Sequence, residues 1–264
     1  MMNNYHSHTY LCRHAGGKAI DYIKEALKLG FKKYGISEHA PMPNLEALGS
    51  VRLLDSEYNK YLHDLEEAIN YGKDKIKIYK GLEVEYFNFY HERYDFFLEE
   101  MDYLILGQHY IILEDGSYLS TYKLETLEHI LIYRDTLLEG LKSGYFNLLC
   151  HPDLCFYNIK NPTKEMLEAL RPVIKLAKKL DIPLEVNANG LRKALKYGPF
   201  KLENAPYPRS VFFKMVKEED AKVIIQSDSH SLDAIYDWAI IEARKFVKDL
   251  GLKEVTDLNM NYKK

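Results

Sequence analysis

Short apolar runs alternate with amphipathic stretches along the whole chain. The apolar runs predict strands that are buried on both faces, and the amphipathic stretches have the period of helices. The predicted strands are residues 4–8, 33–37, 75–85, 103–109, 145–151, 182–187 and 222–227. The predicted helices are residues 18–29, 56–71, 90–98, 125–141, 163–180, 209–219 and 231–250. The segments 42–54, 110–122 and 188–208 show little periodicity, and we expect them to be irregular.

Seven strands that alternate with helices predict an α/β fold with a parallel sheet. The pattern fits both an open doubly wound sheet and a closed barrel. A chain of 264 residues has the ordinary length of one α/β barrel. We therefore expect residues 1–264 to form a single domain.

The charge and the cysteines of the chain limit the classes of partner and the cellular compartment that we expect. The net charge is −3, which gives no bulk electrostatic attraction to nucleic acid or to an anionic membrane. No apolar run approaches the roughly 20 residues that span a bilayer. The three cysteines include no C-x-x-C pair, which favours a reducing cytoplasm. We expect a cytoplasmic protein whose partner is a small molecule.

The first predicted strand carries the pair His6-Ser7-His8. Residues i and i+2 of a strand point to the same side, so both imidazoles can reach one metal ion. Taken alone, such a pair is more typical of a solvated strand edge.

Other polar side chains repeat this placement at the ends of the predicted strands. Seven of the ten histidines lie there, together with two carboxylates: His6, His8, His14, His39, His109, His151 and His230, with Glu83 and Asp228. In a parallel barrel all of these ends lie on one face. So many titratable groups without a cation would suffer desolvation and repulsion, and two or three divalent ions would remove that cost. The pattern therefore predicts a multinuclear metal centre.

Six ordered motifs resemble those of one family. They are His6-Ser7-His8, Ser37-Glu38-His39-Ala40-Pro41, Gly81-Leu82-Glu83, Gly107-Gln108-His109, His151-Pro152-Asp153 and Ser227-Asp228-Ser229-His230. The set resembles the PHP (polymerase and histidinol phosphatase) superfamily, and in particular its histidinol-phosphate phosphatase branch. The resemblance covers nearly the whole chain. It implies a distorted (β/α)7 barrel with the metal site at the C-terminal ends of the strands.

The resemblance also implies how three divalent ions are held. His6, His8, Glu83 and Asp228 would bind the first ion, while Glu83, His109 and His151 would bind the second. His14, His39 and His230 would bind the third. Zinc, manganese and iron all suit such ligands.

The residues expected to contact phosphate match the histidinol-phosphate phosphatase branch less well. The branch has an arginine shortly after His-Pro-Asp, whereas this chain has none between residues 154 and 160. Lys160 and Arg209 are candidate substitutes, and Arg192 and Ser37 are further candidates for phosphate contact. Asp153 is a candidate proton donor to the leaving group.

The expected activity is hydrolysis of L-histidinol phosphate to L-histidinol and phosphate, a step of histidine biosynthesis, by a metal-bridging hydroxide. The missing arginine keeps open a PHP phosphoesterase that acts on another small phosphate ester. A non-catalytic metal-binding module is the alternative from a different class.

Overall fold

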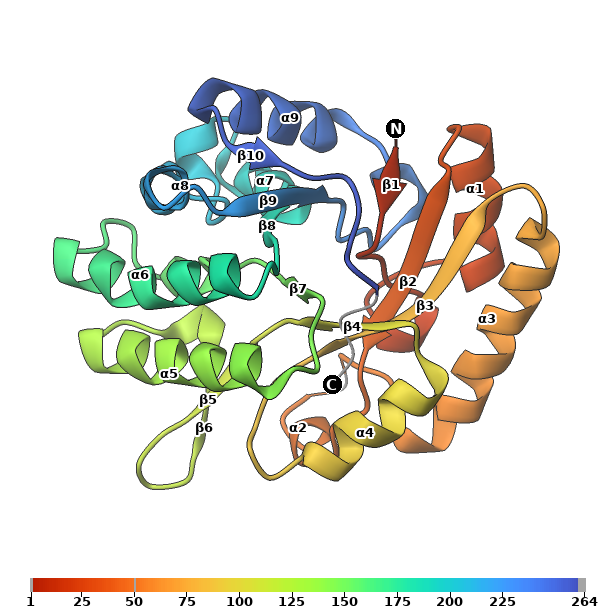
Figure 1. Cartoon of the computed structure of the whole chain (residues 1–264), viewed down its shortest axis with the longest axis horizontal. Coiled ribbons are helices and arrows are strands. Elements are labelled where there is room, and N and C mark those ends of the chain that lie inside the picture. Colours follow the sequence, from red (N-terminus) through yellow and green to blue (C-terminus); the bar gives the residue numbers. More distant parts are fainter. Residues whose placement is uncertain (1, 50, 261–264) are drawn as a thin grey trace.

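Parallel strands curl around a narrow centre, and helices cover their outer side (Figure 1). This computed structural model describes residues 2–49 and 51–260. Within them, one sheet has the order β1-β2-β3-β4-β7-β8-β9-β10, and every neighbouring pair is parallel. The distorted barrel expected from the sequence is confirmed.

The seven predicted strands all occur, although most are shorter than predicted. Their bounds are Asn3–Asn4 (β1), Lys33–His39 (β2), Lys77–Val84 (β3), Tyr103–Leu106 (β4), Leu148–Leu149 (β7), Leu184–Asn187 (β8) and Lys222–Gln226 (β9). The eighth strand, β10 (Lys253–Glu254), pairs with β9 and was not predicted. Both of its residues are exposed, so it carries no buried apolar pattern.

The segments that follow β1 and β9 meet at the C-terminal ends of the strands. Beyond β1, Ser7 forms a parallel bridge with Ser229, which follows β9. The backbone N–H of His8 donates to the carbonyl of Ser229 over 2.9 Å. This contact brings the first and last polar motifs of the chain side by side.

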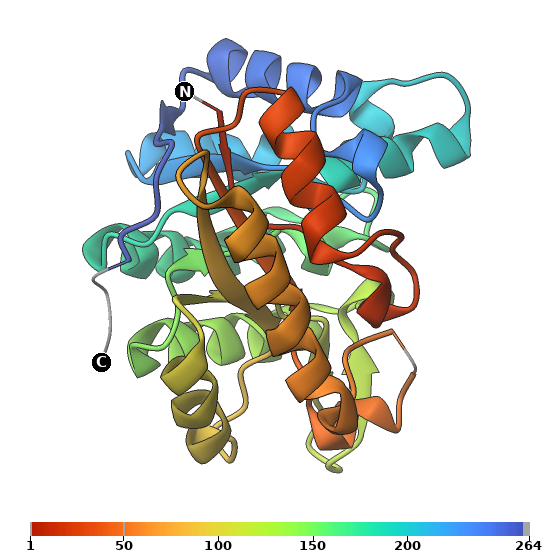
Figure 2. The same cartoon turned by 90° about the vertical axis from the view of Figure 1, so that its right-hand side faces the viewer.

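Helices pack around the outside of the strands, as Figure 2 shows for α1 and α3. The longer helices are Ala19–Lys28 (α1), Tyr58–Gly72 (α3), His91–Glu100 (α4), Leu127–Ser143 (α5), Lys164–Lys179 (α6), Ser210–Glu218 (α8) and Trp238–Leu250 (α9). Thr163 caps α6 by accepting a hydrogen bond from the N–H of Met166. The last helix starts at Trp238, later than predicted, because a 3-10 turn at Leu232–Ala234 precedes it.

The centre of the barrel is filled by Tyr103. A Cβ atom at Gly35 would lie 2.2 Å from the Tyr103 hydroxyl, and one at Gly81 would lie 2.3 Å from its ring. The ring therefore occupies space that only glycine leaves open on the two neighbouring strands. Leu258 from the C-terminal segment packs into the same inner cluster. With its interior filled, the barrel can hold a ligand only at its face.

The three segments expected to be irregular contain regular structure. Residues 110–122 form a hairpin of β5 (Tyr110–Ile112) and β6 (Tyr118–Ser120), which projects from the barrel in Figure 1. The sequence signal for this hairpin was the Asp115-Gly116 pair, which is common in hairpin turns. Gly116 has a φ of 82°, a conformation that glycine adopts readily. The short helices α2 (Pro43–Glu46) and α7 (Ala188–Lys193) occupy parts of the other two segments.

None of the helices in the described residues is both long enough and apolar enough to cross a membrane.

Candidate metal centre

The carboxylate of Glu83 lies at the middle of the predicted ligands. Its Oε1 is 2.8 Å from Nε2 of His151 and 3.5 Å from Nε2 of His109. Its Oε2 is 3.2 Å from Nε2 of His6 and 3.0 Å from Nδ1 of His39. Glu83 is only 1% exposed. The two oxygens thus face different histidines, as a carboxylate that bridges two ions would.

Asp228 faces the same centre from the end of β9. Its Oδ1 lies 3.2 Å from Nε2 of His8, 3.6 Å from Nε2 of His6 and 3.4 Å from Nδ1 of His230. The Nε2 atoms of His6 and His8 are 3.1 Å apart. The His-x-His pair therefore points at one place, although both residues lie beyond the short strand β1.

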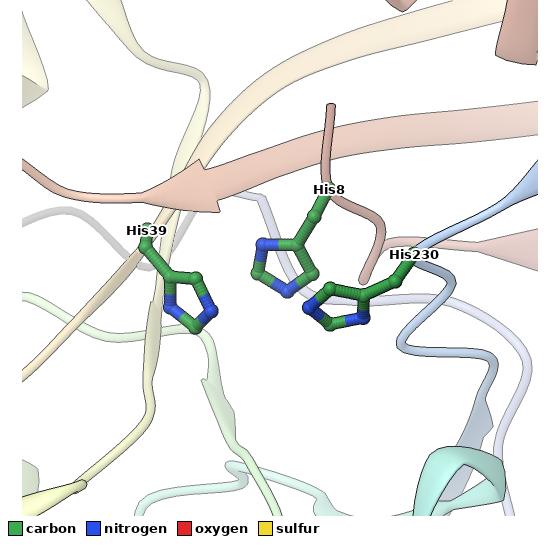
Figure 3. A group of neighbouring side chains, drawn as sticks. All are labelled: His8, His39 and His230. Atoms are coloured by element: carbon green, nitrogen blue, oxygen red, sulfur yellow. The ribbon is translucent and has the colours of Figure 1, made fainter. Parts of the chain in front are cut away.

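The remaining imidazoles gather around His8. Figure 3 shows the rings of His8, His39 and His230 directed toward one another from three separate segments. The ring centroid of His8 lies 4.2 Å from that of His39 and 4.3 Å from that of His230. The ring centroids of His14 and His230 lie 4.5 Å apart. The nine predicted ligands are thus brought together. His8, an expected ligand of the first ion, lies as close to the expected ligands of the third ion as to those of the first.

The chemistry of these donors fits divalent ions. Glu83 Oε2, Asp228 Oδ1 and His230 Nε2 are buried and make no hydrogen bond in the described structure. Buried polar atoms without partners are costly, and a cation supplies the missing partner. Several groups of three side chains have ligand atoms within 4.8 Å of one another, and they include His8, His39 and His230 as well as His6, His8 and Asp228.

The surrounding histidines keep the two central carboxylates ionised. Burial acts to raise the pKa of Glu83, but His6, His39 and His109 hold it well below its ordinary value. Burial acts in the same direction on Asp228, and His6 and His8 likewise hold its pKa far below the ordinary value. Both side chains are therefore charged and ready to act as ligands at neutral pH.

Three further buried glutamates orient the histidines, and sequence reasoning did not assign them. Glu185 lies 2.7 Å from Nδ1 of His6, and Glu85 lies 3.0 Å from Nδ1 of His109. Glu38 lies 3.3 Å from Nδ1 of His8. Carboxylates in this position fix the ring so that Nε2 points at the metal. One signal was available: Glu185 is a lone charge in the otherwise uncharged strand 182–187.

The backbone at two predicted ligands is in an unusual conformation. His151 has a φ of 28° and Asp228 has a φ of 46°, values that non-glycine residues seldom adopt. Glu185 accepts a hydrogen bond from the N–H of His151, and the amide groups of Asn187 and Asn189 donate to Asp228 Oδ2. Such strained positions, held by specific bonds, are typical of functional sites.

The structure corrects the expectation for Arg192. Its guanidinium makes five hydrogen bonds, to both oxygens of Asp237, to the hydroxyl and carbonyl of Ser227, and to the carbonyl of Ala234. These contacts fix the segment that precedes Asp228. Arg192 therefore supports the site from behind, because its donors are engaged by the protein and do not face the ligands.

Arg209 is likewise committed to the protein. Its guanidinium donates to the carbonyls of Pro206, Lys160, Phe156 and Ile159. It ties the segment after β7 to the start of α8, and this role contradicts its expected place on phosphate.

The last three predicted residues have different surroundings. Lys160 is exposed and lines a surface cavity of about 410 Å³ together with Tyr157 and Glu203. The hydroxyl of Ser37 is buried and accepts a hydrogen bond from the N–H of Ser7. Burial raises the pKa of Asp153 to about 7, and one oxygen of this carboxyl accepts a hydrogen bond from the N–H of Arg209. The side chains of Ser37 and Asp153 thus each accept a hydrogen bond from the backbone, at Ser7 and at Arg209.

Curated proteins similar to this chain include two probable histidinol-phosphatases. The protein from Schizosaccharomyces pombe is 25% identical over 85% of this chain and 79% of its own length. The protein from Deinococcus radiodurans is 25% identical over 95% of this chain and 94% of its own length.

Solved structures with the same fold include the histidinol phosphate phosphatase of Lactococcus lactis, complexed with zinc, L-histidinol and phosphate. It covers 98% of both chains at 18% identity, with a TM-score of 0.68. The structure of a putative histidinol phosphatase from Listeria monocytogenes covers 89% of this chain and 98% of that one, at 22% identity and a TM-score of 0.68. The model of the PHP domain family matches residues 4–189. The ordered motifs, the curled parallel sheet and this match agree, and the chain belongs to the PHP domain family.

Proposed function

We propose that this protein is a metal-dependent phosphomonoesterase that hydrolyses L-histidinol phosphate to L-histidinol and phosphate. The observation that carries the proposal is the convergence of seven histidines around the paired carboxylates Glu83 and Asp228. The names of the two curated relatives and the ligands of the Lactococcus lactis structure support this substrate.

We assign three divalent ions to the nine ligands, with Glu83 shared between two of them. Divalent ions at such a site polarise phosphoryl oxygens and lower the pKa of water. The protein's own groups hold this arrangement: Glu185, Glu38 and Glu85 orient His6, His8 and His109, and the amides of Asn187 and Asn189 hold Asp228. The reaction is the attack of water on phosphorus, in line with the departing alcohol oxygen.

A phosphoesterase for another small phosphate ester is the second candidate. It is favoured by the absence of arginine between residues 154 and 160 and by the engagement of both Arg192 and Arg209 with the protein. A different set of contacts to phosphate is compatible with a different ester.

A panel of phosphomonoesters tests the substrate. We expect the zinc- or manganese-loaded protein to show a kcat/KM for L-histidinol phosphate well above its values for a nucleotide, a sugar phosphate and p-nitrophenyl phosphate. Chelation should abolish hydrolysis, and reloading should restore it, since the ions supply the reactive chemistry. An equal kcat/KM for all esters would refute the assigned substrate. Background hydrolysis of every ester after reloading would instead favour a non-catalytic metal-binding module.

The variant Glu185→Gln tests the orienting carboxylates. It keeps the shape of the side chain but removes the charge that faces Nδ1 of His6, so we expect zinc affinity to fall by roughly 10- to 100-fold. Competition with a chromogenic chelator measures this change. Glu165→Gln, at an exposed position in the first turn of α6, is the matched control and should leave affinity unchanged. Unaltered zinc binding in Glu185→Gln would contradict the orienting role.

We further propose that the protein works as one catalytic unit in the cytoplasm. The three buried cysteines, Cys12, Cys150 and Cys155, are free thiols, which supports a reducing compartment. The ligands come from both ends of the described chain, from His6 to His230, which supports a single unit.

A further inference from the structure

Lys193 is surrounded by aromatic rings beside the metal centre. Its Nζ lies 5.0 Å from the ring centroid of Tyr122, 5.3 Å from that of Tyr207 and 5.9 Å from that of Tyr157. We call these three residues the tyrosine cage. The same Nζ is 3.5 Å from the hydroxyl of Tyr122. Between residues 2 and 260, leaving out residue 50, Lys193 forms no ion pair. Burial lowers the pKa of its ammonium group, whereas the carboxylates of Asp228 and Glu83 act to raise it.

The tyrosine cage adjoins two of the metal-centre histidines. The ring of Tyr122 stacks at 12° to that of His109 with centroids 6.4 Å apart, and the ring of Tyr207 is 6.0 Å from that of His151. Lys193 is the last residue of α7, which starts directly after β8 at the face that carries the ligands. Its ammonium group therefore lies on the side of the centre where His109 and His151 stand.

The tyrosine cage is held in place by packing. A Cβ atom at Gly190 would lie 2.1 Å from the carbonyl oxygen of Tyr207 and 2.3 Å from its ring, so α7 and Tyr207 approach as closely as glycine allows. The rings of Tyr122 and Tyr157 are 4.9 Å apart and nearly perpendicular. Ring faces attract an ammonium group without neutralising it, so its charge and the N–H donors that do not face the Tyr122 hydroxyl stay available to a ligand.

The other cationic side chains expected near the site do not offer free donors beside the metal centre. The donors of Arg192 and Arg209 are bonded to Asp237 and to backbone carbonyls, and Lys160 is exposed. A phosphate dianion beside ionised carboxylates needs positive charge in addition to the metal ions. Lys193 meets this need from a preformed position.

We propose that Lys193 is a catalytic residue that binds the phosphoryl oxygens of the substrate, in place of an arginine after His151-Pro152-Asp153. The inference rests on the proposed phosphomonoesterase function and names the side chain that holds the phosphate. It also orients the substrate: the ammonium group of Lys193 repels the amine of histidinol and attracts its phosphate. The phosphate end therefore faces the tyrosine cage, and the amine end points away from it.

Binding of inorganic phosphate to the metal-loaded full chain tests the proposal without relying on turnover. By titration calorimetry we expect the Kd for phosphate to rise at least about tenfold in Lys193→Met and to stay within about threefold of the wild-type value in Lys193→Arg, which keeps the charge. Lys201→Met removes an exposed charge eight residues away and should change nothing. On L-histidinol phosphate, kcat/KM should fall roughly a hundredfold in Lys193→Met.

Three results would overturn the proposal: wild-type phosphate affinity in Lys193→Met, no phosphate binding by the wild type, or loss of metal from Lys193→Met. The third result would make the lysine structural, so metal content and Tm are measured for every variant. A different result would refute the proposed enzymatic function alone. If the wild type binds phosphate through Lys193 but hydrolyses no ester, the phosphate site stands and the enzyme assignment falls.

Discussion

Replacing Asp228 with asparagine is expected to lower kcat on L-histidinol phosphate by at least about a thousandfold. The exchange keeps the shape of the side chain but replaces a charged carboxylate with a neutral amide. Asp228 Oδ1 faces His6, His8 and His230, and it is buried without a hydrogen-bond partner. An amide nitrogen at this position would direct hydrogen atoms at the ion. The same loss is expected for His6→Ala, because His6 is fully buried between Glu83 and Glu185.

The measurement combines steady-state rates with metal analysis of the purified variants. Asp233→Asn is the matched control, since it makes the same exchange at an exposed position five residues along the chain. We expect this control to keep the wild-type rate and metal content. Both site variants should keep a Tm close to that of the wild-type protein without metal, because the change is confined to the face of the barrel. A near-normal rate in either site variant would remove that residue from the centre.

The strands and the predicted ligands could be derived from sequence because each depends on a local pattern. An apolar run marks a buried strand, and a polar residue at its end lies at the face of a parallel barrel. His109 and His151 follow this rule, and both lie beside Glu83. The pattern did not distinguish a barrel from an open sheet, because closure depends on contacts between the two ends of the chain, such as the bridge between Ser7 and Ser229. Those residues are 222 positions apart and carry no local signal.

The residues around the ligands were harder to derive, since their roles depend on distances between strands. The alternation of the predicted strand 75–85 places Glu83 and Glu85 on one side, yet only Glu83 lies at the centre. Glu85 forms an ion pair with Arg52, whose guanidinium donates to both carboxylate oxygens of Glu85 over 3.0 and 2.8 Å. This pairing crosses from β3 to a segment 33 residues earlier. Spacing in sequence could not reveal it.

The same limit explains the error at Arg192. The sequence pattern indicated Arg192 as a phosphate contact, and Lys193, the next residue along the chain, was not among the candidates. In the structure the two neighbours diverge: Arg192 turns to Asp237 at the start of α9, and Lys193 turns to the tyrosine cage. A one-residue step along a short helix rotates the side chain by about 100°, so the choice depends on how α7 packs.

The variant Gly107→Ala is expected to abolish most activity although residue 107 is not a ligand. A Cβ atom there would lie 2.0 Å from Oε1 of Glu83 and 2.6 Å from its Cδ, far inside van der Waals contact. Glu83 cannot retreat easily, because its oxygens are surrounded by His6, His39 and His151. The added methyl group must therefore displace the carboxylate that we place between two ions. Since small misplacements at a reactive centre cost about a hundredfold or more, we expect kcat to fall by at least that factor.

The control for this variant is Gly49→Ala, where an added Cβ atom meets nothing within 4 Å. We expect it to keep the wild-type rate and metal content. Metal titration separates a displaced ligand from a folding defect: Gly107→Ala should remain folded by circular dichroism while its affinity for zinc falls. If Gly107→Ala binds zinc and turns over substrate normally, Glu83 can move without consequence and does not bridge the ions. If Gly107→Ala loses both, and Gly49→Ala, where an added Cβ atom has open space, loses neither, the position of one carboxylate controls the centre.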